Sequence, residues 1–182
     1  MNIFTVVMTL FIFLSFNVVA EDTVQPNIDW RSKKDIKEHI FFTLEPQRGE
    51  VTHGPNFALS DEVSSDDFSE VYLIRSMKID DEELFTLHIT GFYRDNDWRN
   101  YTKARTAGGG QLPLVVLEKT KLSCDKKDLC QYEEKLAIRL DFVDVVDAMT
   151  THLEIIISGN RTDHIKIPGN YFLAMMQSIR AE

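Results

Sequence analysis

The sequence has only two cysteines, Cys124 and Cys130, and their pairing would bring the most distinct chemistry. Five residues separate them, whereas dithiol redox sites use a C-x2-C spacing, and no second cysteine–histidine cluster completes a zinc set. In an oxidising compartment such a pair is by default a disulfide. Closing so short a loop stabilises the fold by only roughly 2 kcal/mol. We therefore predict a local disulfide, provided that the protein is exported.

An apolar N-terminal segment supports export. Residues 3–20 are almost wholly apolar and end in Val18-Val19-Ala20, directly before the acidic Glu21. This pattern predicts a secretory signal peptide over residues 1–20. Because no lysine or arginine precedes the apolar run, an uncleaved anchor is the alternative, although the run is near the lower limit for a spanning helix. We predict a periplasmic or extracellular protein without integral membrane association after cleavage.

The predicted disulfide also sets a register for its hairpin. If Cys124 opposes Cys130, the strands at 112–123 and 130–142 share an apolar row on one face. The facing pairs in that row are Leu122 with Tyr132, Val116 with Ile138, and Leu114 with Leu140. A slip of one residue would move every side chain to the other face, so the coherent row favours this register.

Two carboxylates interrupt this apolar row. Glu118 and Glu134 would be diagonal neighbours, roughly 7–8 Å apart between their Cα atoms, and such a pair could perform acid–base chemistry of the glycosidase kind. Alternatively, both reach water at the rim of the sheet, or Glu134 forms a buried ion pair with Arg75, which interrupts the apolar row of residues 71–79. We favour these alternatives, because no set of sugar-stacking aromatic residues is evident, and we assign no catalytic residue.

The other motifs indicate neither a metal site nor a cofactor. In the hairpin of residues 153–167, Ile155 should oppose Ile165, which leaves His152 and His164 four residues out of step and too far apart to bind one ion. The sequence contains no G-x-S-x-G, H-E-x-x-H or P-loop motif. We therefore predict no metal and no cofactor.

One aromatic pair lies in a polar connection. Trp98 and Tyr101 have turn or helical spacing, and they either pack a loop onto the domain or form a contact surface; we favour packing. Asn100 and Asn160 begin N-x-T sequons, which matter only if the source glycosylates its exported proteins.

The charge of the chain limits its partners. The formal net charge of −9 argues against nucleic acid and anionic lipid as partners, because both require a positive surface. The acidic segment 61–70 is most simply a solvated loop. An alternative is that Asp61, Asp66 and Asp67 present a negative surface to a basic enzyme, as in an inhibitor or immunity protein.

Most of the remaining sequence alternates with the period of two that is typical of β-strands. We predict a mainly β fold, an antiparallel β-sandwich of about seven strands with a short C-terminal helix after Pro168; an α+β fold is the alternative. The predicted organisation is a signal peptide at 1–20, a polar segment at 21–36 in which Trp30 docks on the domain, and one β-rich domain at 37–182.

A set of scattered residues in the C-terminal half gives a weakly specific pattern. They are Trp98, Tyr101, Ala104, Cys124, Cys130, Glu134, Ile165, Ile167, Pro168 and Tyr171. Together with the Gly-rich turn before the cysteines, this order resembles uncharacterised exported proteins of Gram-negative bacteria. The resemblance implies a periplasmic setting and no particular activity.

These observations favour a binding or structural accessory module of the cell envelope, with an envelope protein or glycan as its partner. The alternatives are a glycan or ester hydrolase that uses Glu118 and Glu134, and an inhibitor or immunity protein that uses the 61–70 loop.

Overall fold

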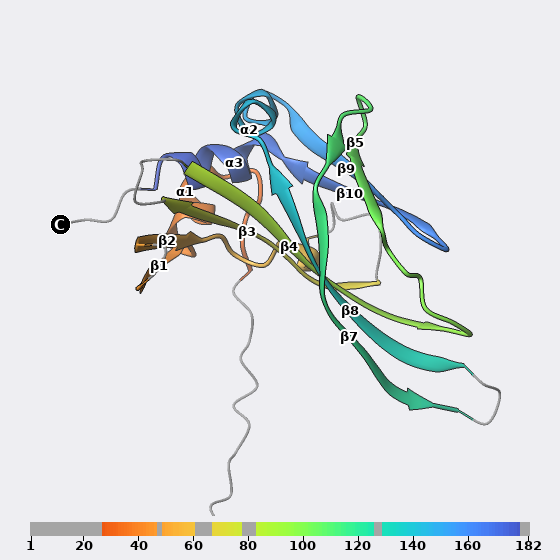
Figure 1. The fold of residues 1–182 in the computed structure, drawn as a ribbon. Helices are drawn as coiled ribbons and strands as arrows, with labels where there is room; N and C mark the ends of the chain where they lie inside the picture. The colour runs from red at the N-terminus through yellow and green to blue at the C-terminus, as the bar shows by residue number, and fades with distance from the viewer. Residues whose placement is uncertain (1–26, 47–48, 61–66, 78–82, 126–128, 179–182) are drawn as a thin grey trace, which may run out of the picture.

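The computed structural model describes residues 27–46, 49–60, 67–77, 83–125 and 129–178. These residues form two antiparallel sheets, three α-helices and one short 3-10 helix (Figure 1). The predicted signal peptide and residues 61–66 of the acidic segment lie outside the described residues. Within the described part of the chain, no helix is long and apolar enough to cross a membrane.

The larger sheet has six strands in the order β1-β2-β3-β4-β8-β7. Their bounds are β1 (Phe41–Glu45), β2 (Gly49–His53), β3 (Phe68–Met77), β4 (Glu83–Asp95), β8 (Cys130–Leu140) and β7 (Leu114–Cys124). The smaller sheet has the order β10-β9-β5-β6. Its strands are β10 (Thr162–Pro168), β9 (His152–Ser158), β5 (Lys103–Thr106) and β6 (Gln111–Leu112).

The helices are α1 (Lys33–Glu38), η1 (Phe57–Leu59), α2 (Phe142–Ala148) and α3 (Gly169–Met176). On one side of the large sheet, α1 and α3 lie beside β1 to β3, and the small sheet lies farther along (Figure 1). A single apolar cluster joins the inner face of the large sheet to the small sheet and to α3. This arrangement buries one face of each sheet, as the alternation in the sequence requires.

The predicted fold class is confirmed. The protein is mainly β, with two antiparallel sheets and a C-terminal helix that begins directly after Pro168. Ten strands occur in the described residues where about seven were predicted, because the polar connections contain short strands such as β2 and β6.

The N-terminal polar segment contributes to the packed structure. Ile36 of α1 is fully buried, and the Lys37 ammonium donates a hydrogen bond to the Gln177 carbonyl after α3. Trp30 docks as predicted, edge-on to Phe57 with their ring centroids 4.9 Å apart. Part of the segment that was predicted to precede the domain therefore packs on it.

The final hairpin has the predicted register. Ile155 opposes Ile165 and Glu154 opposes Lys166. The two isoleucines are fully buried, whereas Lys166 is exposed. Burial of one face is what fixes such a register, because a slip would turn the apolar row toward water.

The β7–β8 hairpin differs from its predicted register. Cys124 opposes Cys130, and the predicted disulfide is present with a Cα–Cα distance of 3.9 Å. Beyond it, Lys121 opposes Tyr132 and Val116 opposes Leu136, because the register shifts twice, at Leu122 and at Leu117. Each such bulge adds one unpaired residue to β7. All three predicted pairs are therefore wrong: Leu122 with Tyr132, Val116 with Ile138, and Leu114 with Leu140.

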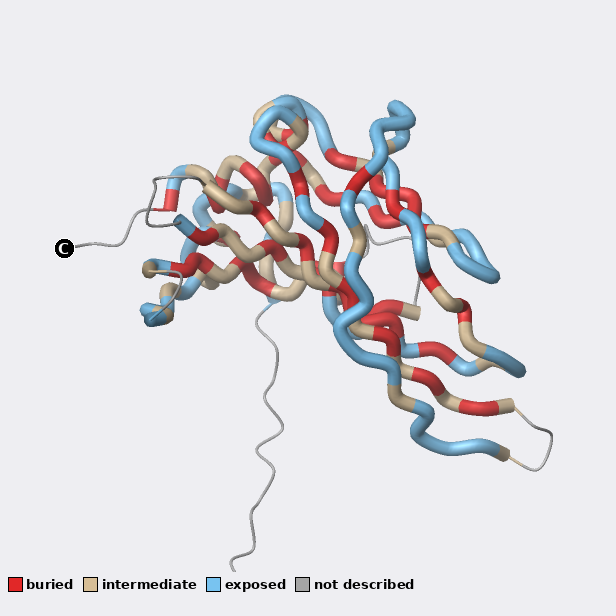
Figure 2. Tube along the Cα trace, viewed as in Figure 1, coloured by how far each residue is buried: buried red, intermediate tan, exposed pale blue. Residues whose placement is uncertain are grey.

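Strand β7 forms one edge of the large sheet and is exposed along most of its length (Figure 2). Bulges are common on edge strands, where they twist the unpaired backbone away from a second chain. The two shifts in β7 also decide which of its side chains face the interior, and they determine the candidate site.

Candidate functional site

The first component of the site is Glu134 on β8, whose side chain is completely buried. Its Oε1 atom accepts a hydrogen bond from the Tyr93 hydroxyl and another from the Asn100 backbone N–H, at 3.0 Å. Its Oε2 atom lies 3.4 Å from Nζ of Lys119, the residue opposite on β7. The carboxylate therefore joins three segments of the chain that are distant in sequence.

The expected ion pair between Arg75 and Glu134 is not formed. Arg75 instead forms an ion pair with Glu83, and it donates a hydrogen bond to the Met175 carbonyl at 3.4 Å. Arg75 lies opposite Phe85 on β4, whereas Glu134 lies opposite Gly91, six residues farther along the same strand. Six strand residues correspond to about 20 Å, which is beyond the reach of an arginine.

The pairing of Glu118 with Glu134 is also wrong. Glu118 lies opposite Lys135, with which it forms an ion pair of 2.8 Å on the outer face of the sheet. Hydrogen bonding to Lys135 lowers the pKa of the Glu118 carboxyl. The bulge at Leu122 places Glu118 and Glu134 on opposite faces, so the two carboxylates do not flank a common substrate position.

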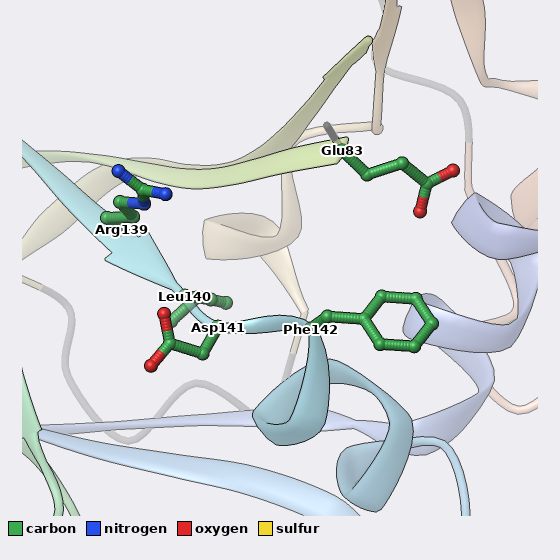
Figure 3. Close-up of a pocket in the computed structure, with 5 residues that line it drawn as sticks. All are labelled: Glu83, Arg139, Leu140, Asp141 and Phe142. Atoms are coloured by element: carbon green, nitrogen blue, oxygen red, sulfur yellow. The ribbon is translucent and has the colours of Figure 1, made fainter. Parts of the chain in front are cut away.

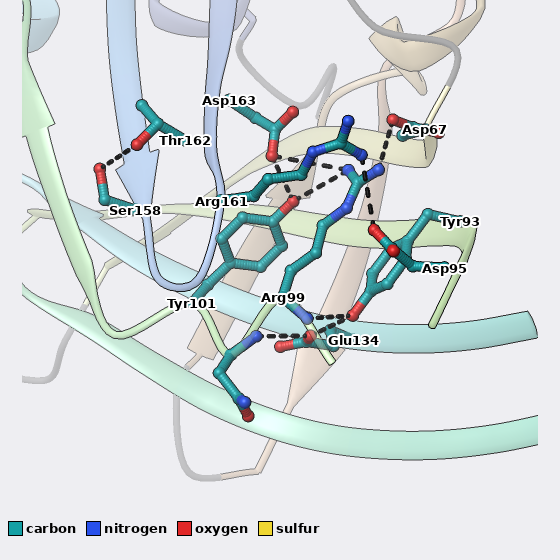
Figure 4. A network of polar contacts seen from close by, with 11 residues as sticks. Asp67, Tyr93, Asp95, Arg99, Tyr101, Glu134, Ser158, Arg161, Thr162 and Asp163 are labelled. Atoms are coloured by element: carbon teal, nitrogen blue, oxygen red, sulfur yellow. Dashed lines mark hydrogen bonds and ion pairs between the residues drawn. The ribbon is translucent and has the colours of Figure 1, made fainter. Parts of the chain in front are cut away.

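The second component is a buried network around Arg99, whose side chain is 2 % exposed (Figure 4). Its guanidinium donates to Asp67 at 2.6 Å and to the Tyr101 hydroxyl at 3.2 Å, and it lies 3.5 Å from Asp163. The Tyr101 hydroxyl in turn donates to Asp163 at 2.6 Å. The guanidinium also lies 4.2 Å from the centre of the Tyr93 ring, a cation–π geometry.

The electrostatics of this network fix its protonation states. Burial and the hydrogen bond to Asp163 raise the pKa of the Tyr101 phenol, and burial raises that of Tyr93. Burial by itself would lower the pKa of Arg99, but its hydrogen bonds to Tyr101 and Asp67 raise it above its usual range. Tyrosine and arginine are already neutral and charged, respectively, at neutral pH, and these shifts move their pKa values farther from it. Such groups suit a structural role better than proton transfer.

The network holds the loop between β4 and β5 against the turn between β9 and β10. The Asn160 side chain donates to the Trp98 carbonyl at 2.9 Å, and its backbone N–H donates to the Arg99 carbonyl. Gly159 is required at this contact, because a Cβ atom there would overlap the backbone oxygens of Arg99 and Asn100. Asn100 itself adopts a positive φ of 52°.

The two aromatic residues of this loop have different roles. Tyr101 is fully buried, so it belongs to the interior and not to a contact surface. Trp98 packs on Tyr132 with ring centroids 4.5 Å apart, and it is only partly buried. Both residues pack as we favoured, and the alternative of a contact surface applies only to Trp98.

Trp98 lines an open depression of about 590 Å³ on the outside of the loop. The other lining residues are Arg94, Asp95, Asp97, Arg99, Asn160 and Arg161. Arg161 lies 3.5 Å from Asp95, and Arg94 forms an ion pair with Asp125. The depression thus combines one aromatic surface with exposed charges of both signs.

A second depression, of about 390 Å³, lies where β8 meets α2. Its polar side chains include Glu83, Arg139 and Asp141, and Figure 3 shows Glu83 extending to one side and Asp141 to the other. Since these groups do not converge on one point, this depression lacks the organised polar groups that are typical of a ligand site.

Comparisons with known proteins gave no match, so the site is interpreted from its own geometry. No protein-family model matches the chain, and neither a curated protein nor a solved structure does. Within the described residues, no three histidine, cysteine, aspartate or glutamate side chains gather in an arrangement that could hold a metal ion.

Proposed function

We propose that this protein is an exported binding module of the cell envelope that holds a partner protein at the depression around Trp98 and Arg161. The observation that carries this proposal is the depression itself. It lies on the loop between β4 and β5, which the hydrogen bonds of the buried Arg99 fix to the rest of the domain. Binding surfaces on loops are effective when a rigid scaffold positions them. The disulfide supports an oxidising compartment.

The character of the depression favours a protein as the partner. Arg94 and Arg161 are each 60 % exposed and lie beside aspartates, so their charges alternate in sign across a small surface. Alternating charges around an aromatic side chain are typical of the polar rim of a protein interface. Charged rims chiefly increase the association rate and the selectivity of binding, which suits an accessory protein that must find one partner.

Affinity capture from an envelope extract tests this proposal. The tagged wild-type protein is compared with the double variant Arg94→Glu/Arg161→Glu, and Lys34→Glu on α1 is the control because it reverses an exposed charge elsewhere. We expect a specific protein to be captured by the wild type and by Lys34→Glu, and its recovery to fall at least tenfold with the double variant.

Two results would contradict the proposal. Equal capture by all three proteins would show that the partner does not use this depression. Retention of the wild type by a purified envelope glycan, without any captured protein, would make the partner a glycan.

A further inference from the structure

Three side chains of complementary reactivity meet beside the candidate site: an amine, a carboxamide and a buried carboxylate. Lys119 Nζ donates a hydrogen bond to Oδ1 of Asn100 at 2.7 Å, and it lies 3.4 Å from Oε2 of Glu134. The carboxamide carbon of Asn100 is directly bonded to the oxygen that the amine contacts. The nitrogen of Lys119 is thus next to an electrophilic carbon and to a base.

The two oxygens of the Glu134 carboxylate have different surroundings. Oε1 of Glu134 is occupied by the Tyr93 hydroxyl and the Asn100 backbone N–H, whereas the buried Oε2 has no hydrogen-bond partner and faces Lys119. A buried oxygen without a hydrogen bond is costly, so its retention calls for an explanation. Acceptance of a proton from Lys119 would provide one.

The reacting groups are also held in place. The Asn100 backbone is constrained by its own hydrogen bond to Glu134 and by the contact with Gly159. Lys119 lies opposite Glu134 in the sheet, and its Nζ lies 5.7 Å from the centre of the Trp98 ring. The Lys119 side chain is 31 % exposed. Fixing an amine next to an amide replaces a slow bimolecular encounter by an intramolecular one, which increases the effective concentration greatly.

We propose that Lys119 and Asn100 form an intramolecular amide bond with the help of Glu134. Glu134 accepts a proton from the Lys119 ammonium, and the neutral amine attacks Cγ of Asn100, forming a C–N bond. The bond between Cγ and the original amide nitrogen then breaks. The two protons lost from Nζ, one of them carried by Glu134, go to that nitrogen, which leaves as ammonium. Glu134 returns to its carboxylate form, and no oxidant or cofactor is consumed.

This bond would act on the loop that carries the candidate binding surface. It would tie the loop between β4 and β5 covalently to β7, the edge strand, across 19 residues of sequence. A cross-link of that kind reduces the conformational freedom of the unfolded chain, as a disulfide does. The inference does not depend on the identity of a partner and goes beyond the proposed function.

Mass spectrometry of the folded, secreted protein tests the bond directly. We expect the intact mass to be lower than that of the disulfide-bonded chain by one ammonia molecule. After reduction and trypsin digestion, the peptide 100–103 should appear joined to the peptide 106–121, since an acylated Lys119 is not cleaved.

Three variants make the result specific. Lys119→Arg keeps the charge but cannot form the amide, so its full mass should be retained. Asn100→Asp should lose one water molecule in place of ammonia if the bond forms. Glu134→Gln should retain the full mass, and circular dichroism establishes that it is folded.

The proposal is overturned if the folded wild type has the full mass of its disulfide-bonded chain. It is also overturned if peptide 100–103 is recovered unlinked together with cleavage after Lys119, or if Lys119→Arg shows the same loss of ammonia as the wild type.

Discussion

At the scale of single residues, the organising side chain is Arg99, which was not identified from the sequence. An arginine that is 2 % exposed is tolerated because two carboxylates, a phenol and an aromatic ring surround its guanidinium. Its Nε atom is buried without a hydrogen-bond partner, so the network is not fully satisfied. Breaking a buried charge network leaves its remaining members unpaired, which costs more than the intact network contributes.

We predict that Arg99→Met lowers the free energy of unfolding by about 3–5 kcal/mol, because Asp67 and Asp163 lose the cation between them. Urea denaturation followed by fluorescence measures the change. Arg105→Met is the matched control, since Arg105 is exposed on β5, and it should change stability by less than about 0.5 kcal/mol. A similar small change for both variants would show that the network contributes little.

At the scale of elements, turns and strand edges decide what the site contains. The turn between β9 and β10 holds the loop of the site in place, and the bulge at Leu122 in β7 turns Lys119 inward and Glu118 outward. At the opposite edge, β1 and β2 form a hairpin in which Phe41 stacks on His53 with ring centroids 4.6 Å apart. Thr43 also contacts Nε2 of His53 at 2.9 Å.

The β1–β2 hairpin should make stability depend on pH. Burial lowers the pKa of His53, partly offset by Glu45, so the folded state disfavours the charged imidazole. Stability should be constant above the unfolded pKa of about 6.5 and should fall as the pH decreases below it, because the unfolded state then binds more protons.

Urea denaturation from pH 8 to pH 5 measures this dependence. His53→Gln should be less sensitive to acid than the wild type, whereas the control His152→Gln, at an exposed position of β9, should behave like the wild type. Identical pH profiles for His53→Gln and the wild type would contradict the assignment.

At the scale of the whole molecule, the described segments share one apolar core. Helix α1 lies against α3 at the end of that core, and the smaller sheet lies against the larger one. The site forms where segments from β4, β8, β10 and the start of β3 meet, so its integrity depends on the packing of both sheets.

We predict that Ile36→Ala lowers the free energy of unfolding by about 2–5 kcal/mol, because it creates a cavity between α1 and the core. Thermal and urea denaturation measure the loss. Lys33→Ala on the exposed side of α1 is the control, and its effect should be small. If Ile36→Ala were as stable as this control, α1 would be a dispensable appendage.

The sequence by itself determined the features that depend on local pattern. Period-two alternation predicted the antiparallel sheets, burial of one face fixed the hairpin of Ile155 and Ile165, and the x5 spacing of the cysteines predicted the disulfide. The position of Glu134 in an apolar row of β8 also indicated a carboxylate in an unusual environment, and its side chain is fully buried. These features follow from interactions between residues close in sequence, or from facing residues in one hairpin.

The tertiary structure alone decided which groups surround Glu134. A bulge inserts a single residue with no clear signal in the sequence, and the bulge at Leu122 reversed the facing of Glu118 and changed the partner of Glu134. Arg99, Asp67 and Asp163 come from three separate segments, and nothing in their local pattern distinguishes them from solvated charges. Their pairing results from how the two sheets pack, because only that packing buries the Arg99 guanidinium between the two carboxylates.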